Sequence, residues 1–271
     1  GPNTLVVSIG QSGETADTVA AMQMVKDKGG KLITICNSEG SQASRIADGS
    51  FYMRSGIEIG VASTKTFVAS LTILNLLAIY LGQSRGTLEP AKFQELVDGL
   101  AQLPRLMGEL IADSSVYQQM AQEYATFDNF LFLGRGMNSP IASEGALKLK
   151  EISYIHAEGY PAGEMKHGPI ALIDSAMAIV ALAPKDTLYD KVANNIREVK
   201  ARDGRVLAVL TEGDTQLAAD VDHVLYIPEA PEHIIPLLTT VPLQMLAYHI
   251  AVLRDRDVDQ PRNLAKSVTV E

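Results

Sequence analysis

A six-residue loop between a short apolar run and a helix-length stretch carries groups that bind an anion. Residues 10–15 read GQSGET. The first turn of a helix has backbone N–H groups without partners inside the helix, and it carries a partial positive charge. Glycine lets a ligand approach the backbone, and the hydroxyls of Ser12 and Thr15 add donors, so the loop could cradle a phosphate. The alternative is that Ser12 or Thr15 only caps the helix, and the spacing alone favours this cap.

A second loop of this kind opens a long apolar stretch. Residues 59–65 read IGVASTK, in which Ser63 or Thr64 is a natural helix cap. Taken alone, the loop is best explained by that cap. If both helix starts face one crevice at the carboxyl ends of parallel strands, Ser63 would also reach a ligand bound there.

Three charged residues share one face of a helix predicted over residues 140–153. Glu144, Lys148 and Glu151 are spaced at i, i+4 and i+7. Such a face is usually solvated, and the spacing alone favours an exposed row of ion pairs. Apolar residues cover much of the remaining helix surface, however, so the charged face could line a cleft. A carboxylate in a cleft could act as a base, because burial raises its pKa while a neighbouring lysine lowers it.

Isolated residues complete the candidate chemistry. His167 lies among turn-forming residues, and a loop histidine titrates near neutral pH and suits proton transfer. His249 falls within an apolar helix pattern and Cys36 within a strand pattern, so we expect both in the core. No group of His, Asp and Glu has metal-ligand spacing. We therefore expect no metal and no cofactor.

Alternating strand and helix patterns must position these groups. In the first part of the chain, strand patterns at 5–9, 32–36 and 51–53 alternate with helix patterns at 15–28 and 63–81. Later strands are expected at 130–133, 178–182, 206–210 and 224–227, and helices at 140–153, 188–201 and 234–253. Helices at 92–110 and 116–124 connect the two parts, and residues 156–169 read as irregular. This alternation predicts an α/β fold with parallel sheets covered on both faces.

The two halves repeat. Successive strand patterns have nearly the same spacing in each half, and each half ends in a long apolar helix, which indicates an internal duplication. The second half has an additional strand and helix at 130–153 without a counterpart in the first half. We therefore expect that one strand and one helix of the first domain are missing from this chain. The expected organisation is an incomplete first domain at 1–85, a helical connection at 86–126, a second domain at 127–255 and a C-terminal tail at 256–271.

Composition excludes several classes of protein. The 271 residues carry a net charge of −9, which disfavours nucleic acid as the main partner. A single cysteine cannot form an internal disulfide, and no signal peptide is recognised, so we expect a cytoplasmic protein. No apolar run reaches the roughly 18 residues of a membrane span. The best candidate, residues 67–81, is interrupted by Ser70, Thr72 and Asn75, so we expect no membrane contact.

Five segments together resemble the isomerase region of the glutamine–fructose-6-phosphate aminotransferase family, also called the glucosamine-6-phosphate synthases. They are residues 12–15, 58–65, 144–156, 166–169 and 259–271. The resemblance implies two SIS (sugar isomerase) domains, each a three-layer α/β/α sandwich with a parallel sheet, the first truncated at its N-terminus. This family of isomerising transaminases converts fructose 6-phosphate and glutamine to glucosamine 6-phosphate and glutamate for hexosamine biosynthesis. Ammonia comes from an N-terminal glutaminase domain.

The resemblance also implies the substrate-binding residues. Gln11, Ser12 and Thr15 would hold the sugar phosphate, and Ser63 would contact the substrate beside it. The remaining substrate-binding positions would be Gly10, Gly13 and Ala265. Glucose 6-phosphate joins fructose 6-phosphate and glucosamine 6-phosphate as an expected ligand.

Four residues would be catalytic by the same resemblance. Glu151 would be the base that moves a proton between C1 and C2 of the open-chain sugar, with Lys148 assisting at a sugar oxygen. His167 would open the sugar ring from the neighbouring subunit, which implies a homodimer. Lys266, on a tail that closes over the sugar, would lie near the carbonyl, where the family is reported to form an imine.

Two departures from the family pattern affect the expected activity. The family usually has Ser where this chain has Gly10, so one hydroxyl donor is lost, worth about 0.5–1.5 kcal/mol. The glutaminase domain is absent from this chain, so we expect that the chain alone cannot use glutamine. Slow isomerisation of a sugar phosphate, or amination with free ammonia, is the expected residual activity. The missing strand would also expose a sheet edge and favour association or instability.

Two other functions fit parts of this pattern. SIS domains also serve as sugar-phosphate sensors, which need the phosphate loop but not Glu151, Lys148, His167 and Lys266 together. All four residues are present, which favours an enzyme. A stand-alone phosphosugar isomerase or deaminase is the other alternative, and the sequence of residues 259–271 favours the synthase over it.

Overall fold

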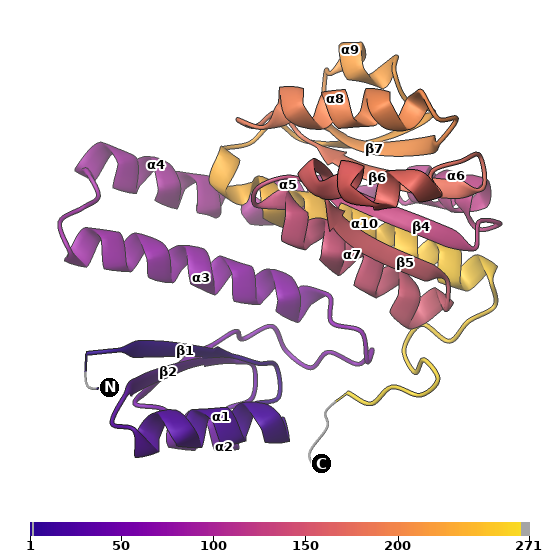
Figure 1. Ribbon diagram of the computed structural model, residues 1–271. Coiled ribbons are helices and arrows are strands. Elements are labelled where there is room, and N and C mark those ends of the chain that lie inside the picture. The colour runs from indigo at the N-terminus through magenta and orange to yellow at the C-terminus, as the bar shows by residue number, and fades with distance from the viewer. Residues whose placement is uncertain (2, 267–271) are drawn as a thin grey trace. The chain divides into compact units, whose positions relative to one another are not determined.

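The computed structural model describes residue 1 and residues 3–266, and the chain divides into two compact units (Figure 1). The first unit comprises residues 1–89 and the end of the chain from residue 262. The second unit comprises residues 90–261, so it includes the helices that follow the first sheet. Each unit is built around its own parallel sheet, which confirms the predicted α/β fold class.

The sheet of the first unit has three parallel strands in the order β1-β2-β3. These strands are β1 (Leu5–Ile9), β2 (Lys31–Cys36) and β3 (Gly49–Tyr52), and they are connected by α1 (Ala16–Asp27) and α2 (Gln42–Ile46). Sequence periodicity does not reveal α2, because five residues are too few to show a helical period. Since all strands run in the same direction, the loops that follow them lie at one edge of the sheet.

Helices lie on both faces of this sheet. Met22 from α1, Leu32 from β2 and Ala43 from α2 form a buried cluster on one face, with Val6 and Val25 packed against it. The third helix, α3 (Lys65–Ser84), lies on the other face, next to β2 (Figure 1). The first unit therefore has three layers.

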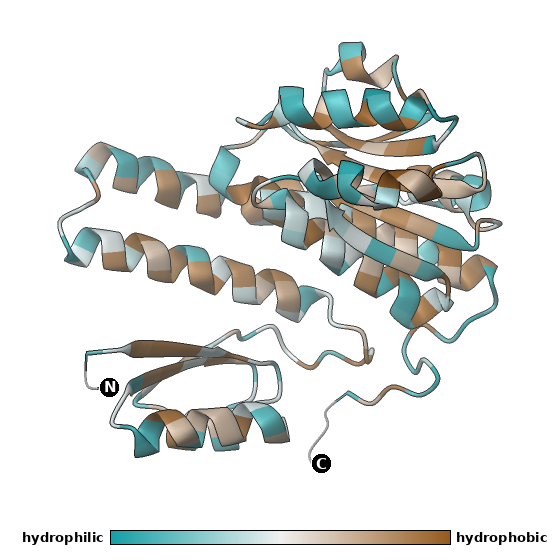
Figure 2. Ribbon diagram, viewed as in Figure 1, coloured by the Kyte–Doolittle hydropathy of each residue, from teal (hydrophilic) through white to brown (hydrophobic). Residues whose placement is uncertain are grey.

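The polar residues of α3 are satisfied within the helix. Ser70, Thr72 and Asn75 each donate a hydrogen bond to the carbonyl oxygen four residues earlier. They therefore do not interrupt the apolar helix seen in Figure 2. By length and composition alone, α3 and residues Glu232–Leu253 meet the requirements of a membrane span, which corrects the expectation that no segment does. The buried share of the apolar window is 11% for α3 and 78% for Glu232–Leu253.

The sheet of the second unit has five parallel strands in the order β5-β4-β6-β7-β8. The strands are β4 (Asn129–Gly134), β5 (His156–Pro161), β6 (Met177–Ala183), β7 (Arg205–Thr211) and β8 (His223–Ile227). The arrangement of β6, β7 and β8 repeats that of β1, β2 and β3. The strand and helix at residues 130–153 are the additional elements that the sequence pattern predicts for this half.

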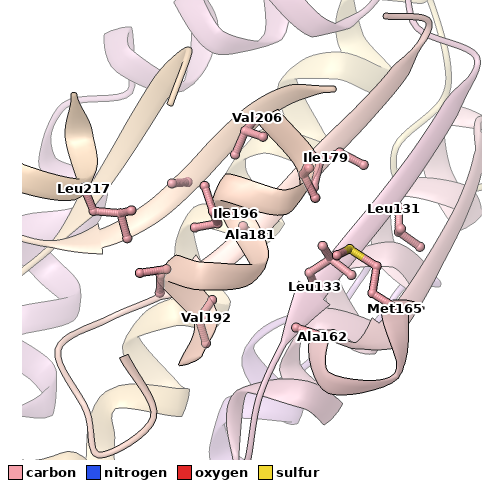
Figure 3. Close-up of a cluster of buried hydrophobic side chains, with 14 of the residues drawn as sticks. Leu131, Leu133, Ala162, Met165, Ile179, Ala181, Val192, Ile196, Val206 and Leu217 are labelled. Carbon is pink, nitrogen blue, oxygen red and sulfur yellow. The ribbon is translucent and has the colours of Figure 1, made fainter. Parts of the chain in front are cut away.

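Helices also cover both faces of the larger sheet. On one face, α7 (Asn138–Ser153) packs against β4 and β5 and against α10 (Ile235–Leu253). On the other face lie α8 (Tyr189–Lys200) and the short α9 (Thr215–Ala218) (Figure 1). The core under these two helices contains Leu131, Ile179, Val192, Ile196, Val206 and Leu217 (Figure 3).

The helices that precede β4 differ from the sequence prediction at one point. A single helix was expected at 92–110, but the chain forms α4 (Pro90–Ala101) and α5 (Leu103–Ala112), followed by α6 (Ser115–Tyr124). Pro104 lies in the first turn of α5. Proline has no backbone N–H and clashes with the preceding turn, so one continuous helix through this position is disfavoured.

The expectation of an irregular stretch at 156–169 is also wrong. This stretch forms strand β5 and two 3-10 helices, η1 (Ala162–His167) and η2 (Pro169–Leu172). Its strand is hard to recognise because β5 is an edge strand and its residues do not alternate regularly between buried and exposed. A Cβ atom at Gly159 would collide with the backbone of Ser143 on α7, so glycine permits α7 to pack closely on β5.

Candidate active site

Loops that follow all three strands of the first unit enclose a cavity of about 590 Å³. The cavity is lined by Gln11 and Ser12 after β1, by Asn37, Ser38 and Glu39 after β2, and by Tyr52, Arg54, Gly56, Ile57 and Glu58 at and after β3. Lys266, near the end of the chain, completes the lining. The cavity thus lies at the carboxyl ends of parallel strands, where ligands bind in open α/β sheets.

The loop at residues 10–15 is fixed by contacts with α2. Gly13 has φ of +69°, and a Cβ atom at this position would collide with Ser41, so the turn requires glycine. Glu14 accepts hydrogen bonds from the backbone N–H of Gln42 (2.9 Å) and from its side-chain amide (2.7 Å). The hydrogen bonds from Gln42 hold the pKa of Glu14 below its usual value. Gly13 and Glu14 therefore hold the loop in place.

The Thr15 hydroxyl does not cap α1. Thr15 occupies the N-cap position of α1, but its side chain makes no capping hydrogen bond. The Ser12 hydroxyl oxygen instead accepts a bond from the Glu14 backbone N–H (3.2 Å), within the loop itself. Side-chain capping of α1 therefore does not explain the presence of the Thr15 hydroxyl.

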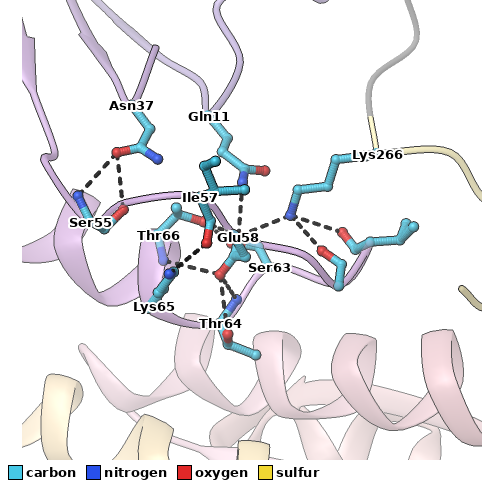
Figure 4. Close-up of polar contacts among 12 residues, drawn as sticks. Gln11, Asn37, Ser55, Ile57, Glu58, Ser63, Thr64, Lys65, Thr66 and Lys266 are labelled. Atoms are coloured by element: carbon cyan, nitrogen blue, oxygen red, sulfur yellow. Dashed lines mark hydrogen bonds and ion pairs between the residues drawn. The ribbon is translucent and has the colours of Figure 1, made fainter. Parts of the chain in front are cut away.

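A buried carboxylate joins three segments of the first unit (Figure 4). The Glu58 side chain is 4% exposed. Its Oε2 accepts hydrogen bonds from the Gln11 amide (2.9 Å), the Thr66 hydroxyl (2.5 Å) and the Lys266 ammonium (2.9 Å). Its Oε1 accepts bonds from the Thr64 N–H (2.8 Å) and hydroxyl (3.1 Å) and from the Thr66 N–H (3.3 Å). Sequence reasoning assigned Glu58 no role.

The electrostatics of Glu58 follow from these contacts. Burial alone would raise its pKa, but hydrogen bonds from Thr66, Thr64 and Lys266 outweigh burial and lower the pKa to about 2. The carboxylate is therefore ionised throughout the neutral and mildly acidic range. It also lies at the first turn of α3, where the helix dipole favours a negative charge.

A second side chain, Asn37, holds the loop after β3. Its Oδ1 accepts hydrogen bonds from the Ser55 N–H (3.1 Å) and hydroxyl (3.0 Å) (Figure 4). Its amide donates to the Gly56 carbonyl (2.7 Å). These bonds tie the loop after β2 to the loop after β3. Nothing in the spacing of Asn37 marks it in the sequence, because its partners lie 18 and 19 residues away.

Ser63 lies beside a neighbouring cavity of about 350 Å³. This cavity is lined by polar and apolar residues of α3 and by Ile9, Gly10, Gln11, Met53 and Ser63. The Ser63 hydroxyl is 2.7 Å from the Thr66 hydroxyl. Gln11 lines both cavities, so the structure brings Gly10, Gln11, Ser12 and Ser63 into one region of the first unit.

Lys266 lies in this region, although it is distant in sequence. Its ammonium donates to Glu58 Oε2 (2.9 Å) and to the carbonyls of Gly60 (2.7 Å) and Val61 (3.4 Å). Ala265, which precedes it, is exposed and does not line the 590 Å³ cavity. Residues 267–271 of the predicted closing tail lie outside the described residues.

The charged face of α7 is buried, so the solvated ladder favoured by spacing alone is wrong. The side chains of Lys148, Glu144 and Glu151 are only 5%, 11% and 20% exposed. Lys148 Nζ lies 2.6 Å from Glu151 Oε2 and 3.4 Å from Glu144 Oε1. Burial raises the pKa of Glu144, and the nearby Lys148 opposes this rise. The three residues form a compact charged group inside the second unit.

Two oxygens of this group, Glu144 Oε1 and Glu151 Oε2, lack a hydrogen bond among the described residues. Among the described residues, no donor is oriented to hydrogen-bond with the buried Glu151 Oε2, although Lys148 Nζ lies 2.6 Å away. Buried carboxylate oxygens are normally hydrogen-bonded, so such an exception requires an explanation. A carboxylate held by charge, with a lone pair still available, is suited to accept a proton from a substrate.

His167 stands apart from the α7 group. It ends the 3-10 helix η1, and its side chain is 76% exposed. The closest acidic group is Glu164, with its Oε2 4.0 Å from His167 Nε2. Within the part of the chain that the structure describes, no group of three or more His, Cys, Asp or Glu residues could hold a metal ion.

Comparison with known proteins connects this geometry to a family. The SIS domain family matches residues 1–80 and 124–254, which is most of both units. The chain belongs to the SIS domain family. The SIS match agrees with the two α/β units and their parallel sheets, and it confirms the fold expected from the sequence resemblance.

Several SIS relatives have a more specific name. The chain is 51% identical to a glutamine–fructose-6-phosphate aminotransferase (isomerizing) of Bacteroides thetaiotaomicron and 50% identical to one of Thermus thermophilus. These matches cover 98% and 99% of the chain but only 44% of each relative. The solved C-terminal domain of a glucosamine-fructose-6-phosphate aminotransferase from Francisella tularensis matches with a TM-score of 0.90 and 39% identity. That match covers 94% of this chain and 72% of the other.

Proposed function

We propose that the chain binds fructose 6-phosphate in its open-chain form and isomerises it, and that it forms glucosamine 6-phosphate when ammonia is supplied. The observation that carries this proposal is the buried charged group on α7, in which the Glu151 carboxylate lies 2.6 Å from the Lys148 ammonium and is more exposed than the Glu144 carboxylate, 20% against 11%. The names of the relatives support the identity of the substrate. The chain spans 44% of the length of those relatives, so we propose for it only isomerisation and amination with supplied ammonia, and not the use of glutamine.

The phosphate is held by the loop after β1. Backbone N–H groups at the start of α1 and the hydroxyls of Ser12 and Thr15 supply donors, and the helix dipole adds partial positive charge. Gln11 and Lys266 also line the 590 Å³ cavity. Anchoring the phosphate fixes the distance from it to C1 and C2 and thereby orients the reacting carbons.

Glu151 transfers the proton. In the ketose, the Glu151 carboxylate removes a proton from C1, the electron pair forms the C1–C2 double bond, and the Lys148 ammonium gives a proton to the C2 oxygen, which yields the enediol. The neutral Lys148 amine then takes the proton of the C1 hydroxyl as the C1 aldehyde forms, and the Glu151 carboxyl returns its proton to C2, so both residues regain their starting states. With ammonia, the C2 carbonyl first becomes an imine with loss of water, and the same proton shift gives the 2-amino sugar.

Two finer features complete the proposal. We assign ring opening to His167, acting in a neighbouring copy of the chain within a cytoplasmic homodimer. The exposure of its side chain, 76%, supports action outside its own unit. Lys266 contacts the open-chain carbonyl region, which its position on the cavity wall supports.

Product formation tests the catalytic part of this proposal. The chain is incubated with fructose 6-phosphate, with or without ammonium, and the sugar products are followed by NMR. Glu151→Gln should abolish formation of glucose 6-phosphate and glucosamine 6-phosphate while sugar binding remains. Glu158→Gln is the matched control, because this glutamate is 54% exposed on β5 and has no assigned role. Normal turnover by Glu151→Gln would overturn the assignment of the base.

Binding affinity tests the phosphate loop separately. The double variant Ser12→Ala with Thr15→Ala should weaken binding of fructose 6-phosphate much more than binding of unphosphorylated fructose, as measured by calorimetry. The reason is that the lost hydroxyls face the phosphate and not the sugar hydroxyls. Equal losses for the two ligands would place the phosphate elsewhere.

A further inference from the structure

Glu58 is buried in a segment whose neighbours are exposed. It lies in the loop between β3 and α3, where the side chains of Ile57 and Ile59 are 88% and 80% exposed. The Glu58 side chain, by contrast, is 4% exposed. A charged group that turns inward while its apolar neighbours turn outward has lost favourable hydration, and it persists only when the protein replaces that hydration.

The described donors divide between the two carboxylate oxygens of Glu58. Oε1 receives only groups at the start of α3, from Thr64 and Thr66. Oε2 receives the Thr66 hydroxyl together with the Gln11 amide and the Lys266 ammonium. Thr64 occupies the N-cap position of α3 without capping the helix through its own side chain. Oε1 of Glu58 thus serves as the acceptor for backbone N–H groups at the start of α3.

The second oxygen connects groups that are far apart in sequence. Gln11 lies 47 residues before Glu58, and Lys266 lies 208 residues after it. Both residues line the 590 Å³ cavity with Glu58. Because their donors meet on a single oxygen, moving the carboxylate would displace the amide and the ammonium together.

We propose that Glu58 is a positioning residue of the sugar site, whose Oε2 places Gln11 and Lys266 while its Oε1 anchors both to the first turn of α3. The inference rests on the proposed function, which assigns Gln11 and Lys266 to the substrate. Glu58 itself acts through these two residues. Removing its charge breaks the ion pair with Lys266, whose ammonium keeps the carbonyl oxygens of Gly60 and Val61 as acceptors.

Chemical labelling of Lys266 tests this role without requiring a substrate. The chain is treated briefly with an amine-acetylating reagent, and acetylation of each lysine is measured by mass spectrometry. In Glu58→Gln, labelling of Lys266 should rise several-fold, because its ammonium is no longer held by a carboxylate. Labelling of Lys26, which pairs with Asp48 in the same unit, should not change and is the internal reference.

A matched variant separates positioning from helix capping. Thr64→Ala removes a hydroxyl that donates to Oε1 of Glu58 and not to the Oε2 that holds Lys266, so it should leave the labelling of Lys266 at the wild-type level. Circular dichroism confirms folding, and Glu58→Asp replaces Glu58→Gln if the latter does not fold. In Glu58→Asp the charge is kept but withdrawn by one methylene, and Lys266 labelling should again rise.

Binding of fructose 6-phosphate is measured on the same variants by calorimetry. We expect the dissociation constant to rise several-fold in Glu58→Gln and to stay near the wild-type value in Thr64→Ala. A folded Glu58→Gln or Glu58→Asp chain with wild-type labelling of Lys266 would overturn the proposal. Failure of the wild-type chain to bind the sugar would contradict the proposed function instead, and the labelling would still decide the role of Glu58.

Discussion

At the scale of single residues, Gly10 is the position where the sequence resemblance implies that a hydroxyl donor is lost. Gly10 has no positive φ, and a Cβ atom built there meets nothing within 4 Å. Gly10→Ser should therefore fold normally and add one hydroxyl donor beside the phosphate loop. We expect fructose 6-phosphate to bind roughly two- to twelvefold more tightly, as measured by calorimetry, from one neutral hydrogen bond of about 0.5–1.5 kcal/mol.

The neighbouring glycine is the control for this change. Gly13→Ser places a side chain in the space of Ser41 at a φ of +69°, so it should lower the thermal unfolding temperature. Unchanged affinity in Gly10→Ser would show that the phosphate does not approach this position.

Glu58 should make the free energy of unfolding depend on pH. Its pKa is lowered from 4.5 to about 2 in the folded chain, so its contribution to stability is complete above pH 4.5 and is lost as the pH falls toward 2. The shift corresponds to a contribution on the order of 3 kcal/mol. Denaturant unfolding of the wild type and of Glu58→Gln should differ most near pH 6 and converge near pH 2. A difference that does not depend on pH would contradict the hydrogen bonds assigned to the carboxylate.

At the scale of elements, the close packing of α7 on β5 positions the charged group of α7. Gly159→Ala should force the strand away from the backbone of Ser143, because the added Cβ collides with it. Overpacking of this kind costs about 1–3 kcal/mol, and thermal unfolding should show the loss. Gly108→Ala is the control within α5, where a Cβ meets nothing within 4 Å and helix propensity favours alanine by up to about 1 kcal/mol. Equal effects of the two substitutions would contradict the packing described for β5.

The elements also show what sequence periodicity can predict. Strands and helices whose residues keep a regular period were placed within a few residues, including the long helix that becomes α10. The break between α4 and α5 was missed because apolar spacing continues across Pro104. The edge strand β5 was missed because it has no clear alternation and contains Gly159 and Pro161, which are uncommon in strands.

Some features of the candidate site could also be predicted from local spacing, and others could not. Local spacing predicted the turn between β1 and α1 and the shared face of Glu144, Lys148 and Glu151, because helix and turn geometry act over a few residues. Spacing could not predict that this face is buried, since burial depends on packing against distant elements. It also could not reveal the hydrogen bonds of Glu58, whose partners at Gln11 and Lys266 are 47 and 208 residues away.

At the scale of the whole molecule, the two units repeat one fold but carry different functional groups. The first unit provides the cavity at the carboxyl ends of β1, β2 and β3, with its hydroxyl, amide and ammonium donors. The second unit provides the buried carboxylates and lysine of α7. Binding and proton transfer are thus assigned to different halves of a duplicated SIS chain, and variants in the two halves should have separable effects.

Exchange of hydrogen for deuterium at the sugar tests the central claim most directly. The chain is incubated with fructose 6-phosphate in D₂O, and NMR follows incorporation of deuterium at C1. A base that moves a proton between C1 and C2 exchanges part of that proton with solvent, so the wild type should incorporate deuterium. Glu151→Gln should still bind the sugar phosphate yet incorporate none above the rate without protein. Incorporation by Glu151→Gln at the wild-type rate would contradict the account.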